Sequence, residues 1–484
     1  MPASYDRVHE VRDPLYGFVK LSEAEWEIVN CPEFQRLRDI RQLAMGHMVY
    51  PGANHTRFEH SIGCLHLSTL MFDALVERDD GILEREFRLS RDGQSRALQV
   101  LRLAALLHDV GHAPFSHSGE ELLPWRVDSS GQPALDDDGT PVRVTHEEMS
   151  AAVIRESSIR EAIDKRFRAA YGDIVDEVVA VGTGFEFVSE LKRLPHHEFL
   201  NELLTGEFGS DRIDYLLRDA YHSGQKSGEF DYRRLVGSIA MVPPPKEAEQ
   251  EHRIGFDEGG WLVAEQMVVA RYLMYQSLYF HKTKRIYEMH LEQFMKEWAK
   301  TQWGDEETLP RTVQDYVEVS DSRVLQALYQ AAVDSTCPGH VPAKRFIDRS
   351  HMRLAKELIL SDNLDPNKKD GRYPCKGRFD KLKNDVSIKF GPDTLTDEPD
   401  HSATRMFTEA NKIWVILDGD TRYLDAISEI VRGMSSKIWR GRVYAEPGRR
   451  GEVKGWCNQW IVDNPLSDFD LSTGEPGNGQ GRTR

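Results

Sequence analysis

Residues 96–117 read Arg-Ala-Leu-Gln-Val-Leu-Arg-Leu-Ala-Ala-Leu-Leu-His-Asp-Val-Gly-His-Ala-Pro-Phe-Ser-His. The first part of this stretch is apolar over most of its circumference, so it predicts a helix that is largely buried. His108 and Asp109 follow directly at the predicted helix end, and His112 and His117 lie in the next turns. Packing of a helical core does not call for imidazoles at this density, because histidine is only an intermediate core residue. The stretch therefore predicts a polar centre at the end of a buried helix.

The flanking sequence is predicted to be helical as well, from about Leu21 to Leu123. Residues 58–76 place apolar side chains near helical spacing. A Pro-, Gly- and Asp-rich segment over residues 124–143 indicates a surface loop or small hairpin. Helix formation is expected to resume near Thr145, which makes a capping box with Glu148 three residues later.

The later part of the chain combines one long helix with a different type of structure. A continuous helix is predicted from about Trp261 to Trp298, and the sequence beyond about Gly304 is rich in loops. A smaller α+β appendage is expected there, with strands at 413–416 and 442–444 and a helix over 420–436. The fold class is thus mainly α. The predicted organisation is a helical core over residues 1–300, a C-terminal α+β region over 301–464 and a disordered tail over 465–484.

Composition restricts the class of protein. Apolar residues make up 40 % of the chain and charged residues 29 %, as in globular proteins, and no run reaches the ~20 apolar residues of a membrane span. The five cysteines are scattered and the N-terminus lacks the layout of a signal peptide, so a cytoplasmic location is expected. The net charge of −17 makes a nucleic-acid backbone an unfavourable partner, although a few arginines suffice for a small anion.

Two histidines and two aspartates, His60, His108, Asp109 and Asp211, form a candidate metal centre. Imidazole nitrogen and carboxylate oxygen suit Mn, Fe, Ni, Zn and Mg, and a mixed set with open positions is typical of catalytic sites. The His-Asp pair by itself is weak evidence, because it is more often a capped helix end with a hydrogen-bonded histidine.

A second polar pattern follows at residues 210–219. Asp211, Tyr215 and Asp219 recur every four residues beside apolar Leu216 and Leu217, so they share one stripe of a predicted helix. The stripe indicates a helix that faces a polar cavity, and the alternative is a solvated charged face.

Four ordered motifs resemble those of the HD-domain deoxynucleoside triphosphate triphosphohydrolases, which comprise bacterial dGTPase-like enzymes and the vertebrate enzyme with a sterile-alpha-motif domain. The resemblance covers about Asp13 to Glu288. It implies an HD-domain helical core. The motifs are Arg57-Phe58-Glu59-His60-Ser61, His108-Asp109-Val110-Gly111-His112, Thr145-His146-Glu147 and Asp211-Arg212-Ile213-Asp214-Tyr215-Leu216-Leu217-Arg218-Asp219.

The resemblance assigns roles to the catalytic residues. His60, His108, Asp109 and Asp211 would hold one divalent ion. His117 and Glu120 match a His–carboxylate pair that transfers a proton beside the α-phosphate, and a carboxylate that supports an imidazolium suits that task. His112 and His146 match further phosphate-side histidines that can hold a second metal, whereas His146 could also be an ordinary helix-start residue.

The same resemblance implies a substrate pocket. Arginine guanidinium groups would meet the triphosphate, because they bind phosphate oxygens in pairs. Tyrosine rings would pack against the sugar and favour deoxyribose, unless they are plain core aromatics. The implied substrate-binding residues are Gln42, Arg57, Arg212, Tyr215, Asp219, Arg271, Tyr275 and Tyr279.

This chain matches the family's regulatory nucleotide site only in part. Family members that bind an activating guanine nucleotide between subunits carry an Asp where this chain has Asn30, in Asn30-Cys31-Pro32-Glu33-Phe34-Gln35-Arg36-Leu37-Arg38. Gln35 and Arg38 remain, so a phosphate-binding cleft is possible without guanine-specific activation. From about residue 300 the resemblance ends.

The function expected from these residues is metal-dependent hydrolysis of a dNTP to nucleoside and triphosphate, by a homo-oligomer such as a dimer or tetramer. One alternative is an HD-type nuclease, phosphodiesterase or nucleotidase that cleaves single-stranded nucleic acid, a cyclic nucleotide or a nucleoside monophosphate. A second is a nucleotide-sensing assembly protein, which would not need the His117–Glu120 pair. Base preference and the identity and number of the metal ions are left open.

Overall fold

The structure is a computed structural model, and the chain is described over residues 8–128, 130–136, 139–188, 193–245, 251–304, 308–359, 375–399, 413–434 and 438–466. The mainly α architecture predicted from the sequence is confirmed, with small sheets at the periphery. Nearly all of the predicted disordered tail, from residue 467 onward, lies outside the described residues.

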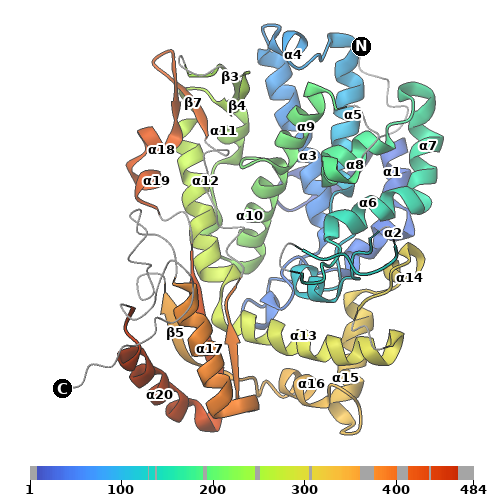
Figure 1. Cartoon of the computed structure of the whole chain (residues 1–484). Coiled ribbons are helices and arrows are strands. Elements are labelled where there is room, and N and C mark those ends of the chain that lie inside the picture. Colours follow the sequence, from blue (N-terminus) through green and yellow to red (C-terminus); the bar gives the residue numbers. More distant parts are fainter. Residues whose placement is uncertain are drawn as a thin grey trace.

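Three helices form the centre of the fold: α3 (Arg57–Arg78), α5 (Arg91–Leu107) and α10 (Ser210–Ser223). The helix α3 packs against both α5 and α10 (Figure 1). The C-terminal turns of α5 are buried all round, as their composition predicts, so its end is fixed inside the molecule. The predicted helices over 58–76 and 96–107 are thus confirmed, each somewhat longer than expected.

The remaining helices up to residue 237 enclose this centre. They are α1 (Glu23–Val29), α2 (Pro32–Gln35), α4 (Ile82–Arg85), α6 (His146–Glu156), α7 (Ser158–Tyr171), α8 (Val175–Thr183), α9 (Pro195–Thr205) and α11 (Tyr232–Gly237). The capping box of Thr145 and Glu148 is present at the start of α6. The loop over 124–143 carries isolated antiparallel bridges, including Trp125 to Arg143, as expected for a small hairpin.

The predicted continuous helix over 261–298 is wrong in one respect. The structure has α12 (Trp261–Met274), a π-helical turn over Tyr275–Tyr279, and a separate helix α13 (Lys282–Trp303). Phe280 ends the π turn, and His281 caps α13 by accepting a hydrogen bond from the amide of Thr283. Apolar periodicity continues across this break, so the sequence pattern could not reveal it; π turns are frequent at functional sites.

Beyond α13 the chain forms α14 (Val313–Val317), α15 (Asp321–Val333), α16 (His340–Ile347), α17 (Lys376–Phe390), α18 (Leu424–Ile427), α19 (Glu429–Gly433) and α20 (Arg450–Asp463). The helix predicted over 420–436 is corrected: residues 420–423 are a strand, and two short helices follow. Ser428 ends one helix and caps the next, which interrupts the helical pattern.

The strands are β1 (Val8–Asp13), β2 (Gly17–Ser22), β3 (Ile239–Val242), β4 (Arg253–Phe256), β5 (Arg353–Ile359), β6 (Thr394–Asp397), β7 (Trp414–Leu417), β8 (Asp420–Tyr423) and β9 (Arg440–Ala445). They form an antiparallel β1–β2 hairpin, a sheet of order β3-β4-β7-β8 and a sheet of order β5-β9-β6. The pair β4–β7 is parallel, so strands near the C-terminus complete a sheet begun by β3 and β4.

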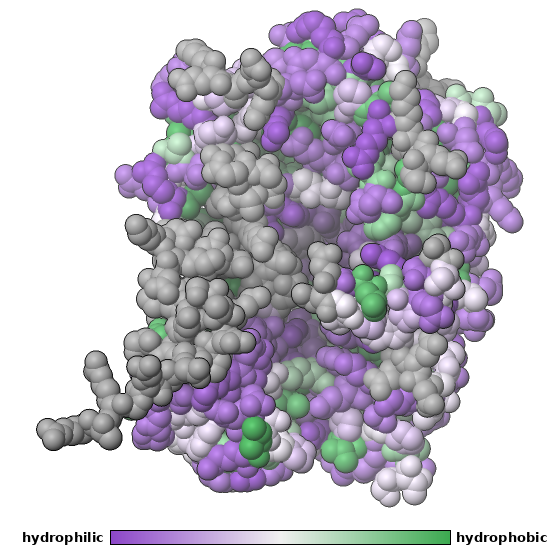
Figure 2. Space-filling view, in the orientation of Figure 1, coloured by the Kyte–Doolittle hydropathy of each residue, from purple (hydrophilic) through white to green (hydrophobic). Residues whose placement is uncertain are grey.

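Buried apolar side chains gather in one large cluster around α3, α5 and α10 and in smaller clusters around α13 and between α17 and α20. The face shown in Figure 2 is mainly hydrophilic, with scattered hydrophobic residues. Within the described ranges, every helix is too short or too polar to span a lipid bilayer.

Candidate metal centre

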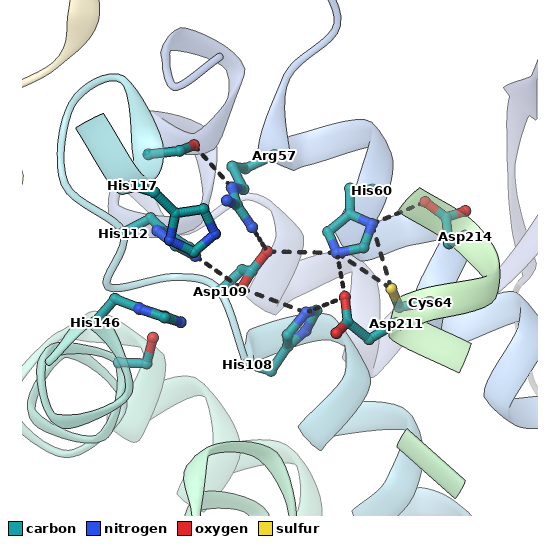
Figure 3. A network of polar contacts seen from close by, with 12 residues as sticks. Arg57, His60, Cys64, His108, Asp109, His112, His117, His146, Asp211 and Asp214 are labelled. Carbon is teal, nitrogen blue, oxygen red and sulfur yellow. Dashed lines mark hydrogen bonds and ion pairs between the residues drawn. The ribbon is translucent and has the colours of Figure 1, made fainter. Parts of the chain in front are cut away.

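The four predicted metal ligands converge from three helices (Figure 3). His60 Nε2 lies 3.1 Å from Asp211 Oδ1 and 3.4 Å from Asp109 Oδ2. His108 Nε2 lies 3.4 Å from Asp109 Oδ1 and 3.8 Å from Asp211 Oδ1. The two imidazoles thus point their Nε2 atoms at the same two carboxylates.

The imidazole of His60 is oriented by a buried carboxylate on its far side. Its Nδ1 is 2.8 Å from Asp214 Oδ2, and Asp214 also accepts two hydrogen bonds of 2.8 Å from Arg218 and one of 2.8 Å from the hydroxyl of Tyr16. Such a carboxylate partner fixes the tautomer and leaves Nε2 available as a ligand.

Close packing of α3 on α10 makes this contact possible. A Cβ atom at Gly63 would lie 1.9 Å from Asp214 Oδ1 and 2.5 Å from an Arg218 nitrogen. Only glycine leaves room for the Asp214–Arg218 pair against α3.

The backbone of α5 orients His108. Its Nδ1 is 2.9 Å from the carbonyl oxygen of Ala105, which directs Nε2 toward the carboxylates. That Nε2 atom is buried without a hydrogen-bond partner among the described residues. A buried polar atom without a partner is costly, and a cation beside it removes the cost.

The carboxylates of the centre are held in the ionised form that a cation requires. Burial raises the pKa of Asp211, but the neighbouring imidazoles of His108 and His60 hold it far below its usual value. Burial acts likewise on Asp109, whose pKa is held well below its usual range chiefly by the Arg57 guanidinium. Arg57 pairs with Asp109 and donates a 2.9 Å hydrogen bond to Ser116 Oγ. The donor set therefore fits a divalent cation.

Cys64 also borders the centre, because its Sγ lies 3.6 Å from both ring nitrogens of His60. Burial raises the pKa of this thiol to about 12. Cys64 also forms a group with His60, His108 and Asp211 that could hold a metal ion, so the thiol adjoins the predicted ligand set.

A second cluster adjoins the centre and contains His112, His117, Glu120 and His146. Glu120 Oε1 lies 2.9 Å from Nδ1 of both His117 and His146. His112 stacks on His146 at 4.0 Å between ring centroids, and its Nε2 is 3.2 Å from Asp109 Oδ1. Burial lowers the pKa of His146, but the hydrogen bond and charge of Glu120 outweigh it and raise that pKa above its usual value.

The turn between His112 and His117 has an unusual backbone. Phe115 and Ser116 both have positive φ, 61° and 54°, which is costly for residues other than glycine. Asp321, in the C-terminal half of the chain, stabilises this backbone conformation, because its Oδ1 accepts a 2.7 Å hydrogen bond from the amide of Phe115.

Two of the three predicted phosphate-binding arginines contact the same carboxylate, Glu207, which the sequence did not indicate. Arg212 Nη1 and Arg271 Nη1 lie 2.5 Å and 2.8 Å from Glu207 Oε2. Arg271 also lies over the ring of Tyr275 at 5.9 Å.

Three of the four predicted sugar-binding residues, Tyr215, Asp219 and Tyr279, lie in contact with one another. Tyr279 donates a 2.7 Å hydrogen bond to Asp219 Oδ2, and His55 Nε2 lies 2.7 Å from Asp219 Oδ1. The rings of Tyr215 and Tyr279 meet edge to face at 6.3 Å. Gln42 Oε1 is buried without a hydrogen-bond partner among the described residues, so it remains available to a ligand.

The three residues of the implied regulatory site make local contacts. The side-chain amide of Asn30 donates a 2.8 Å hydrogen bond to the backbone carbonyl of Trp26. Arg38 donates to Gln35 at 2.8 Å and lies 3.5 Å over the ring of Phe58. The guanidinium is thus already engaged within the chain.

Sequence reasoning missed Asp214, Glu207, His55 and Asp321. Asp214 stands three residues after Asp211 on the same helix, so helical spacing could have placed it behind His60. His55 and Asp321 have partners that are distant in the chain, and Glu207 contacts the nearby Arg212 but also Arg271, which is 64 residues away. No local pattern marks these three residues.

Fold and site define a mainly α-helical protein with a His/Asp centre that could hold a divalent cation. Residues 57–202 match the HD domain and residues 230–336 the HD associated region. The chain is a member of the HD-domain family. The match to the associated region extends beyond residue 300, where the sequence resemblance was expected to end.

The chain is also similar to curated proteins and to solved structures. The uncharacterised protein MJ1154 of Methanocaldococcus jannaschii is 25 % identical over 465 residues, 95 % of this chain and 84 % of that protein. The human deoxynucleoside triphosphate triphosphohydrolase SAMHD1 is a homologue, 29 % identical over 306 residues, 60 % of this chain and 45 % of the human protein. A crystal structure of a hypothetical protein from Aquifex aeolicus superposes with a TM-score of 0.69 at 27 % identity, covering 93 % of this chain and 99 % of that chain.

Proposed function

We propose that this protein is a metal-dependent phosphohydrolase that cleaves a deoxynucleoside triphosphate into deoxynucleoside and triphosphate. The observation that carries the proposal is the convergence of the ligand set His60, His108, Asp109 and Asp211 beside a His–carboxylate cluster. The relationship to SAMHD1, which bears the name of this activity, supports it.

The donor set would hold a divalent ion, with Mn, Mg, Fe, Ni and Zn all compatible. A divalent ion supplies an acidified water and a polarised phosphoryl oxygen when bound. His112 and His146 are proposed to contact the phosphates or to hold a second ion.

The chain's own residues handle the proton and the substrate. Water adds to the α-phosphorus, the bond to the 5′-oxygen breaks, and that oxygen takes up a proton. His117 is the proposed proton donor, because its Nδ1 faces Glu120 at 2.9 Å and its side chain is largely exposed. An adjacent carboxylate stabilises the imidazolium that donates the proton.

Arg212 and Arg271 are the proposed ligands of the phosphates. Tyr215 and Tyr279 would flank the sugar, with Asp219 and Gln42 meeting its 3′-hydroxyl group. Assembly of this protein into a homo-oligomer is part of the proposal, and light scattering of the purified chain measures it.

Incubation with each of the four dNTPs and each divalent ion tests the proposal, with nucleoside and triphosphate separated by ion exchange. His60→Ala and Asp211→Ala should abolish product, whereas His9→Ala, a matched substitution on β1, should not. The alternatives are included as substrates: labelled single-stranded oligonucleotide, a cyclic nucleotide and a nucleoside monophosphate. Turnover of one of these without dNTP hydrolysis would replace the proposal, and nucleotide binding without any turnover would favour a sensing role.

A further inference from the structure

Glu207 lies between the two arginines proposed to bind the substrate phosphates. One oxygen, Oε2, lies 2.5 Å from Arg212 Nη1 and 2.8 Å from Arg271 Nη1. A single carboxylate therefore bridges two guanidinium groups. It thereby occupies both guanidinium groups that are proposed to bind phosphate oxygens.

The turn that carries Glu207 is tightly built. A Cβ atom at Gly206 would lie 2.3 Å from the carbonyl oxygen of Glu202, and one at Gly209 would lie 2.2 Å from that of Leu204. Phe208 between them packs edge to face on Phe256 at 4.8 Å. The backbone thus holds Glu207 at a defined position beside α10.

A cavity of about 310 Å³ adjoins this carboxylate. Glu207 and Arg212 line it, and Arg253 of β4 contributes a second positive charge to its lining. If the Glu207 side chain leaves Arg212 and Arg271, this cavity has room for it, and Arg253 supplies a positive charge there.

We propose that Glu207 is an internal competitor of the substrate, which occupies Arg212 and Arg271 in the resting protein and yields them to a polyphosphate. The inference rests on the proposed role of the two arginines. After cleavage, Glu207 would pair with them again and so promote release of the triphosphate product.

Charge makes the exchange feasible. Two guanidinium groups and one carboxylate leave a net positive charge, which a polyphosphate neutralises with several oxygens at once. Ligand binds only to the open form, in which Glu207 has left both arginines. The apparent dissociation constant therefore rises as the fraction of protein in the open form falls. Removal of the Glu207 charge should therefore tighten binding of any polyphosphate.

Titration calorimetry with inorganic tripolyphosphate in EDTA tests the inference without metal and without turnover. Glu207→Gln should lower Kd about tenfold relative to wild type, the size expected if about a tenth of the resting protein is open. Glu207→Asp, which keeps the charge on a shorter side chain, should give a smaller decrease. Glu202→Gln changes another glutamate that lines the same cavity and should leave Kd within about twofold.

Unchanged or weaker binding by Glu207→Gln would overturn the inference, because it would mean that Glu207 only holds the arginines in position. Thermal melting identifies misfolded variants. If Glu207→Gln is misfolded, the Kd of Glu207→Asp is compared with that of the wild type instead. Absence of dNTP turnover in the wild type would refute the proposed function and leave this measurement intact. With turnover, KM of Glu207→Gln should fall without an increase in kcat.

Discussion

Replacement of Asp214 by asparagine tests whether this buried carboxylate tunes the proposed metal ligand His60. The side chain is fully buried and accepts one hydrogen bond from Tyr16 and two from Arg218, besides its contact with His60 Nδ1. Asparagine keeps the shape but loses the negative charge that supports the imidazole. Loss of such a partner lowers metal affinity about 10- to 100-fold, or about 1.4–2.7 kcal/mol.

The same substitution weakens the fold, because Arg218 is buried and keeps Asp13 at 2.9 Å and Glu59 at 3.8 Å as its remaining counter-charges among the described residues. Breaking a buried ion pair costs about 3–5 kcal/mol, and the remaining Asp13 makes this an upper value. Urea unfolding of the metal-free variant measures this loss separately from metal binding.

Equilibrium dialysis against Mn²⁺, with free ion counted by electron paramagnetic resonance, measures the affinity. Tyr16→Phe is the matched control, since it removes a hydrogen bond of 2.8 Å from the same carboxylate and leaves the His60 contact in place. It should cost about 1 kcal/mol of stability and change metal affinity little. If folded Asp214→Asn binds Mn²⁺ as tightly as Tyr16→Phe does, Asp214 does not tune His60 and the reasoning fails.

Three further predictions concern packing and pH. Gly63→Ala should destabilise the protein by at least about 1–3 kcal/mol in urea unfolding, because the new Cβ would lie 1.9 Å from Asp214 Oδ1. Asp321→Ala should cost about 1–3 kcal/mol by the same measurement, since it leaves the buried amide of Phe115 without its 2.7 Å acceptor. Burial lowers the pKa of His290 from 6.5 to about 4, so the folded protein keeps this imidazole neutral while the unfolded chain is already protonated. Stability should therefore fall by about 3 kcal/mol on this account as pH drops from about 6.5 to 4.

Each of these has a clear contrary outcome. Gly63→Ala with wild-type stability would show that α3 and α10 are not in close contact. An undisturbed Asp321→Ala variant would show that the amide finds another acceptor. For His290, the control is a His290→Gln variant, whose unfolding free energy should depend less on pH over this interval; an equal slope would assign the pH dependence to other groups.

The sequence by itself determined what depends on neighbours within a few turns. Apolar runs placed α3 and α5, the Thr145–Glu148 capping box placed the start of α6, and helical spacing aligned Asp211, Tyr215 and Asp219 on α10. Helix formation and capping are set by residues about four positions apart, so a linear pattern is enough to predict them.

Only the tertiary structure decided how distant groups pair. The partner of His60 is 154 residues away, the carboxylate on Arg271 is 64 residues away, and the acceptor for the Phe115 amide is 206 residues away. The π turn at Tyr275–Tyr279 was hidden as well, because apolar spacing continues through it. Such contacts depend on how closely whole helices approach, and the packing of the complete chain sets that distance.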